Sequence, residues 1–93
     1  MLVEIITPDA KLFEGDVNSI KLPGTNGGFE ILNNHAPIIS ALTEGILSID
    51  LESPLSEDQK HDAIEVESPE KISVKIKGGV AELTNNKLIV LAE

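Results

Sequence analysis

The chain is divided into short runs of alternating apolar and polar residues, each closed by glycine, proline or asparagine. The clearest run places Ile72, Val74 and Ile76 on one face, with Ser73 and Lys75 between them. Such alternation indicates a half-buried β-strand, and many short strands at this spacing are typical of a sandwich or barrel. No stretch carries the apolar stripe of a useful helix. The sequence therefore predicts an all-β fold of eight to ten short strands.

The expected strands follow from these runs. They lie at residues 3–6, 11–14, 17–22, 29–32, 38–43, 46–51, 72–77, 80–83 and 87–91. Gly15-Asp16 is expected to stop the second strand, and the three glycines and one proline of Pro23–Gly28 predict a loop. With 93 residues the chain has the length of one domain, residues 1–93. Its core must consist of Ile, Leu and Val, because Phe13 and Phe29 are the only aromatic residues.

Composition excludes several classes of function. The absence of cysteine excludes disulfides, thiolate catalysis and Cys-zinc sites. The formal charge of −9, with lysine as the only basic residue besides two histidines, argues against binding to nucleic acid or anionic lipid. No basic segment with a following apolar run marks a signal peptide, and no run approaches the length of a membrane span. We therefore expect a soluble cytosolic protein without direct membrane insertion.

One segment, residues 52–70, differs from the rest in composition. It holds seven acidic residues against one lysine, together with several serines and prolines. We interpret it as a long, solvated and mobile hairpin excursion. The alternative is an acidic docking or cation-binding loop, but the segment contains no glycine and does not fit the spacing of a calcium loop.

Candidates for chemistry are few. His35 and His61 are the only histidines, no G-x-S-x-G elbow occurs, and neither histidine has a metal-ligand partner one helical turn away. The glycine-rich segment Pro23–Gly28 lacks the lysine and hydroxyl residue of a phosphate-binding loop. The sequence thus predicts no catalytic, cofactor, metal or nucleotide site.

A rigid corner at His35 has two interpretations. Pro37 fixes its own backbone and pushes Ala36 to an extended conformation, so the corner is stiff. His35 either satisfies nearby backbone groups, or it offers one donor and one acceptor to a partner. Residue type alone favours the first interpretation.

Seven short segments carry a resemblance to a known family. They are Leu12–Gly15, Ser19–Gly24, Gly27–Leu32, His35–Ile38, Leu42–Gly45, Gly78–Leu83 and Asn86–Ala92. Their order and spacing resemble the N-terminal domain of the epsilon subunit of F-type ATP synthases, called delta in mitochondria. The likeness covers residues 2–51 and 71–93.

The resemblance implies a ten-stranded β-sandwich of two five-stranded sheets at the foot of the rotating central stalk. It places the domain on the cytoplasmic face of the bacterial inner membrane, or in the organellar equivalent. Gly28, Phe29, Glu30 and His35 would face the polar loops of the membrane c-ring, whereas Thr7 and Pro8 would meet the gamma subunit. Because subunit contacts are apolar, one outward strand face should carry exposed Leu, Ile or Val.

The sequence departs from the family pattern at its end. The family usually continues into a two-helix C-terminal domain that inhibits ATP hydrolysis and in some members binds ATP, whereas this sequence stops at Glu93. If Glu93 is the natural end, helical inhibition and the ATP site are absent. If the chain is a fragment, nothing follows about regulation.

Two other classes of protein fit parts of the sequence. A lipoyl- or biotinyl-like carrier domain is also small, acidic and all-β, and Lys87 after Asn85-Asn86 has the place of its modified lysine. The carrier's D-K-A or M-K-M neighbours are missing, however. An extracellular adhesion sandwich would more often carry cysteines and a signal peptide.

Overall fold

The computed structural model describes all 93 residues, which form nine β-strands and one 3-10 turn. The elements are β1 (Leu2–Ile6), β2 (Lys11–Gly24), β3 (Gly27–Leu32), β4 (Ile38–Leu42), β5 (Gly45–Leu51), η1 (Glu57–Gln59), β6 (Ile64–Ser68), β7 (Lys71–Ile76), β8 (Gly79–Thr84) and β9 (Lys87–Ala92). No helix is long and apolar enough to cross a membrane.

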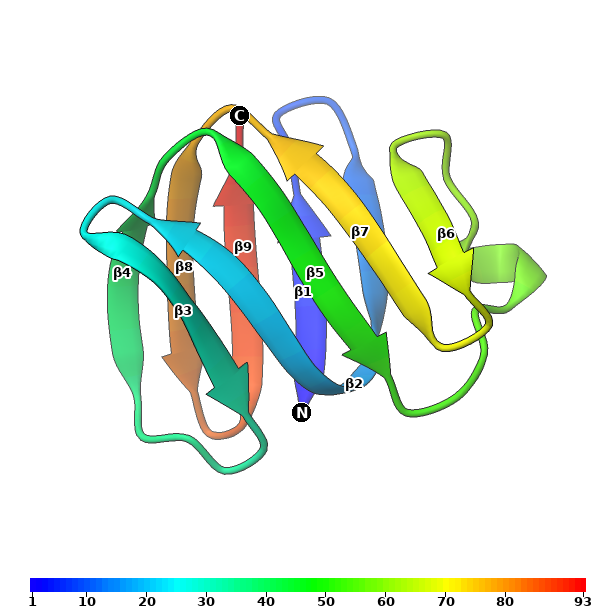
Figure 1. Cartoon of the computed structure of the whole chain (residues 1–93), viewed down its shortest axis with the longest axis horizontal. Helices are drawn as coiled ribbons and strands as arrows, with labels where there is room; N and C mark the ends of the chain where they lie inside the picture. Colours follow the sequence, from blue (N-terminus) through cyan, green and yellow to red (C-terminus); the bar gives the residue numbers. More distant parts are fainter.

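The strands form two stacked layers (Figure 1). The front layer has the order β3–β2–β5–β7–β6, and the back layer has the order β4–β8–β9–β1–β2. The strand β2 belongs to both layers: residues 11–16 pair with β1, whereas residues 17–24 pair with β5 and β3. All pairings are antiparallel except that of β1 with β9. The front strands run obliquely across the back strands, as is usual for packed sheets.

The core lies between the two layers. It contains 21 buried apolar residues, and all of them except Met1 and Phe13 are alanine, valine, leucine or isoleucine. Ile20 illustrates the packing, because it is fully buried and its cross-strand neighbours Ile31 and Ile49 are fully buried too. The alternation predicted for Ile72, Val74 and Ile76 is confirmed, since all three face this core.

The prediction of an all-β sandwich is confirmed, but the predicted ten strands are nine. The reason is β2, which was expected to stop at Gly15-Asp16 and instead continues through both residues. A Cβ at position 15 would lie 2.5 Å from Gln59 Nε2 and 2.9 Å from the Phe13 ring, so a larger residue there would displace these side chains. The long strand crosses from one layer to the other and so serves in each.

The acidic segment 52–70 contains more structure than an excursion. It holds η1 and the strand β6, which pairs with β7 at the edge of the front layer. Gln59 Nε2 donates a hydrogen bond of 3.0 Å to the carbonyl oxygen of Glu14, and Leu55 packs against the core. Side-chain contacts therefore hold the segment against β2.

Candidate partner-binding surfaces

The outward face of the back layer carries an apolar patch, which we call the back patch. It consists of Ile6, Ile39, Ala41, Val80, Ile89 and Leu91. Ile6, Leu91, Val80 and Ala41 are successive cross-strand partners and form one row across four strands. Leu91 is 54% exposed and Val80 is 43% exposed. Exposed apolar side chains that gather on one face mark a contact site, so the expected outward apolar face is confirmed.

Thr7 and Pro8 lie at the rim of the back patch. They line a shallow hollow together with Val80 and Leu91. The turn that carries them is held by three hydrogen bonds, of which the shortest joins the backbone N–H of Thr7 to the carbonyl oxygen of Ala10 over 2.8 Å. The two residues predicted for gamma contact therefore border the back patch.

Sequence reasoning did not single out the residues of the back patch themselves. The signal was present in β9, where Leu88 and Val90 face the core while Ile89 and Leu91 face outward. A strand that is apolar on both sides is typical of a sheet covered on both faces. The pattern could have marked β9, but it could not say which neighbouring strands complete the surface.

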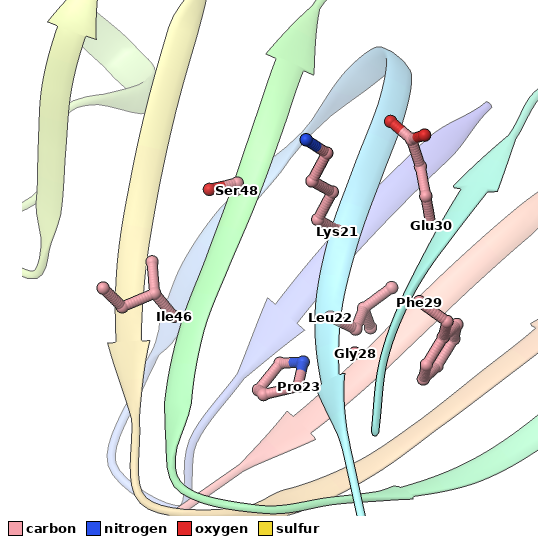
Figure 2. Close-up of a pocket in the computed structure, with 8 residues that line it drawn as sticks. All are labelled: Lys21, Leu22, Pro23, Gly28, Phe29, Glu30, Ile46 and Ser48. Carbon is pink, nitrogen blue, oxygen red and sulfur yellow. The ribbon is translucent and has the colours of Figure 1, made fainter. Parts of the chain in front are cut away.

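A groove of about 540 Å³ crosses the front layer, and we call it the front groove. Its lining comes from three strands: Lys21, Leu22 and Pro23 of β2, Gly28, Phe29 and Glu30 of β3, and Ile46 and Ser48 of β5. Figure 2 shows the side chains of Lys21 and Glu30 at one end and Pro23 and Ile46 at the other. The groove is thus charged at one end and apolar at the other, and it includes three of the four residues predicted to face the c-ring.

The fourth predicted residue, His35, lies outside the front groove. It follows the turn at the far end of β3, where the backbone N–H of His35 donates to the carbonyl oxygen of Leu32 over 3.3 Å. His35 therefore does not line the groove with Gly28–Glu30, and a partner shared by all four residues stays a prediction. Ile31 and Leu32 of β3 and the turn that follows lie between Glu30 and His35, and each extended residue lengthens the chain by about 3.3 Å.

The histidine corner supports the first interpretation of His35, in which the ring satisfies a nearby backbone group. Its Nδ1 lies 2.6 Å from the carbonyl oxygen of Ala36, and because a carbonyl only accepts, this nitrogen carries the proton. Asn34 ties the corner to the β8–β9 turn, since its N–H donates to Asn86 Oδ1 over 2.9 Å. The corner is thus satisfied internally, and Nε2 of the exposed His35 remains as an acceptor.

A charged cluster lies beside the back patch. Lys11 Nζ is 2.9 Å from Glu4 and 2.7 Å from Glu14, and Lys87 Nζ is 3.8 Å from Glu4. The hydrogen bond from Lys11 holds the pKa of Glu4 below its ordinary value, and the hydrogen bonds to Glu14 and Glu4 raise the pKa of Lys11. Glu4 and Glu14 are direct cross-strand partners, so Lys11 separates two like charges.

The substitution Lys11→Met is expected to lower stability at neutral pH and to change its pH dependence. The pKa of Glu4 is lowered in the folded protein, so ionised Glu4 stabilises the fold above its ordinary pKa of 4.5. This contribution is lost as the pH falls through the folded pKa. Urea unfolding at several pH values should show a difference in midpoint between the wild type and Lys11→Met that shrinks in acid. Lys77 forms no ion pair, so Lys77→Met is the control and its midpoint should stay close to that of the wild type. If the midpoint difference between the wild type and Lys11→Met is the same at every pH, the prediction is wrong.

The acidic segment shows no arrangement for binding a cation. No group of three or more His, Asp or Glu side chains lies close enough to hold a metal ion. Lys60 Nζ pairs with Glu57 over 2.9 Å, and His61 Nδ1 accepts a hydrogen bond from the N–H of Ala63 over 2.9 Å. These two contacts are within the segment, whereas Gln59 and Glu52 contact Glu14 and the N-terminal amine outside it.

Comparison with known families decides between the classes of protein that the sequence left open. A model of the family "ATP synthase, Delta/Epsilon chain, beta-sandwich domain" matches residues 1–64. The chain belongs to this family. It is 36% identical over 91 residues to an ATP synthase epsilon chain of Campylobacter concisus and covers 59% of that protein. It is 33% identical over 93 residues to the epsilon chain of Salinibacter ruber, of which it covers 58%. Against the epsilon chain of Chlorobaculum tepidum the identity is 36% over 91 residues and the coverage 86%.

Solved structures with the same fold also come from rotary ATP synthases. A chain of the Tetrahymena thermophila mitochondrial ATP synthase central stalk/c-ring structure matches 99% of this chain with a TM-score of 0.73 and 20% identity. The match covers 62% of that chain. A chain of the Euglena gracilis mitochondrial ATP synthase matches 99% of this chain with a TM-score of 0.74 and 18% identity, and 49% of that chain is covered. These likenesses confirm the sandwich fold.

The carrier interpretation of Lys87 does not survive the family assignment. Lys87 does follow a tight turn, in which Asn85 and Asn86 have positive φ angles of 51° and 59°. Its amine, however, lies 3.8 Å from Glu4 Oε1 within the charged cluster. The lysine therefore belongs to the ion pairs of an epsilon-type sandwich.

Proposed function

We propose that this domain is a non-catalytic part of the central stalk of a proton-translocating F-type ATP synthase. It couples rotation of the c-ring to the gamma subunit and the catalytic head during ATP synthesis. The observation that carries this proposal is an apolar back patch on a domain of the epsilon family. The named relatives are epsilon chains, and one of the similar solved structures is that of a mitochondrial central stalk with its c-ring.

The back patch is the proposed contact surface for gamma, with Thr7 and Pro8 at its border. Subunits that stay together usually bury apolar surfaces of more than about 2,000 Å². In the back patch one apolar row crosses four strands, and in the neighbouring row Ile39 and Ile89 alternate with Glu82 and Glu4. A packed β-sandwich transmits strain because its core has little free volume. The domain would act as a rigid block between ring and gamma.

The c-ring contact is proposed for the front groove and the histidine corner. Gly28, Phe29 and Glu30 line the groove, whereas His35 presents Nε2 at the opposite end of β3. A contact that includes both must run along the length of β3, which is about 20 Å for six residues. The polar loops of the ring could supply a donor for Nε2 of His35 and a partner for the carboxylate of Glu30.

The place of the domain follows from these contacts. It would be peripheral to the membrane, on the cytoplasmic face of the bacterial inner membrane or in the organellar equivalent. Its role needs no cofactor, metal or nucleotide, because shape and hydrogen bonding at the two surfaces supply the coupling.

Co-purification with gamma tests the proposal. The substitution Leu91→Glu is expected to abolish this co-purification. A carboxylate at position 91 would be buried without a partner in the contact, which costs several kcal/mol and weakens binding by about a hundredfold or more. Leu32→Glu is the matched control, because Leu32 is 56% exposed and lies on the outward face of the front layer. Circular dichroism should show that both variants fold. If the wild-type domain binds neither gamma nor the gamma–ring assembly, the proposed function is wrong.

A further inference from the structure

The strand β4 has an open edge. On one side it pairs with β8 over its full length, and on the other side it meets β2 only at the pair Gly24 and Leu42. Two backbone hydrogen bonds close this end: Thr25 N–H donates to Ala41 O over 3.1 Å, and Thr43 N–H donates to Pro23 O over 2.8 Å. The rest of the edge, towards Ile38, has no neighbouring strand.

The direction of these two bonds shows which backbone groups are unpaired. Hydrogen-bonding groups of successive residues point to opposite sides of a strand. Ala41 and Thr43 point towards β2, so Ile39 points to the same side, away from β8. Ala41 faces Thr25, so the N–H and C=O of Ile39 are the donor and the acceptor that remain on the open part of the edge.

The open edges of the molecule differ in protection. In natural proteins, charges, prolines or bulges on an edge strand prevent it from pairing with another chain. Edge strand β6 carries Glu65 and Glu67, and edge strand β3 carries Glu30. The sequence of β4, Ile-Ile-Ser-Ala-Leu, has neither a charge nor a proline. It is the one edge whose sequence favours pairing.

The side chains along this edge are also incompletely covered. Ile39 is 74% exposed on the outward face, the highest value among the large apolar residues. On the inward side, Ile38 of β4 and Phe29 of β3 pack against the core but are only partly buried. Both faces at the edge of β4 therefore have apolar surface that an added strand would cover.

We propose that an extended segment of the gamma subunit adds to the open edge of β4 as a further strand of the back layer. This inference rests on the proposed function, because the same subunit is assigned to the back patch. The position of the β4 edge beside the back patch supports this assignment. Ile39 and Ala41 belong to the back patch, so outward side chains of the added strand extend that surface. Inward side chains of the added strand cover Ile38 and Phe29. The segment has alternating apolar residues and spans about five positions.

Hydrogen exchange of the gamma-bound domain tests the added strand. In the isolated domain the amide of Ile39 should exchange rapidly, whereas those of Ser40 and Leu42, which point towards β8, are protected. On binding to gamma, exchange at Ile39 should slow by about a hundredfold or more. Unchanged exchange at Ile39 in the complex would overturn the added strand while leaving the proposed function intact.

The substitution Ile39→Pro provides a second measurement, with Ile39→Ala as its control. Both variants lose the side chain, but only proline removes the N–H, which has no partner in the isolated domain. The proline variant should therefore fold, and it should bind gamma about tenfold more weakly than Ile39→Ala. Equal binding of the two variants would contradict backbone pairing. Protection of Ile39 without gamma, in a dimer of the domain, would instead assign the edge to a second copy.

Discussion

The substitution Gly79→Ala is expected to unfold the domain. Gly79 begins β8 with a φ of 147°, a backbone conformation that residues with a side chain rarely adopt. A Cβ at this position would also overlap the carbonyl oxygen of Leu91 and lie 3.1 Å from Cα of Ala92. The backbone strain alone costs about 1–3 kcal/mol. Together with the overlap of two paired strands, it should consume most of a stability that is about 5–15 kcal/mol in small domains.

Two other glycines serve as controls for this prediction. Gly27 has a φ of 118° and open space around it, so Gly27→Ala tests the backbone strain without the overlap. At Gly28 the nearest atom to an added Cβ is Leu22 O at 3.6 Å, an ordinary contact, so Gly28→Ala should be nearly neutral. Urea unfolding should rank the variants Gly28→Ala, Gly27→Ala, Gly79→Ala in order of increasing loss. A stable Gly79→Ala variant would mean that β8 and β9 can separate at this point.

The fold could be predicted from the sequence where local alternation decides the structure. Ile72, Val74 and Ile76 are buried as expected, because a half-buried strand shows its two faces directly in the sequence. The strand end expected at Gly15 was wrong, because β2 continues through this residue and the neighbour beside it comes from a distant part of the chain. The side chain of Gln59, far along the chain from Gly15, packs beside this glycine.

The strand β6 could not be predicted for a related reason. Only Ile64 of its five residues is buried, so the segment has the composition of a solvated loop. Its strand conformation depends on pairing with β7, where Ile64 opposes Val74 and Glu65 opposes Ser73. Propensity of an edge strand depends on this context rather than on its own residues.

The candidate surfaces were predictable in part. The motif around Gly28–Glu30 indicated a surface that the structure shows as a groove, but the turn after β3 moves His35 away from it. The back patch required the topology, because Ile39 lies on β4, about forty residues before the β8–β9 hairpin that carries Val80 and Leu91. The three side chains lie close together because the strands are ordered β4–β8–β9 in the back layer.

Substitutions of two isoleucines should distinguish a contribution to the stability of the domain from a contribution to gamma binding. Ile20 is fully buried between the layers, whereas Ile39 is 74% exposed. Ile20→Ala removes buried atoms and leaves a cavity, and it should cost about 2–5 kcal/mol of the free energy of unfolding. Ile39→Ala removes only exposed atoms, so its effect on that free energy should stay within about 0.5 kcal/mol.

Gamma binding should show the reverse order for the two variants. At a temperature where Ile20→Ala remains folded, it should bind gamma nearly as well as the wild type, since its site lies inside the domain. Ile39→Ala should bind more weakly, because truncation of an apolar side chain in a packed contact costs more than about 1 kcal/mol when the residue is central. Unfolding curves and titrations with gamma measure the two effects independently. If Ile39→Ala keeps full affinity, the exposure of Ile39 has no role in the gamma contact, and the surface that binds gamma must be centred away from β4.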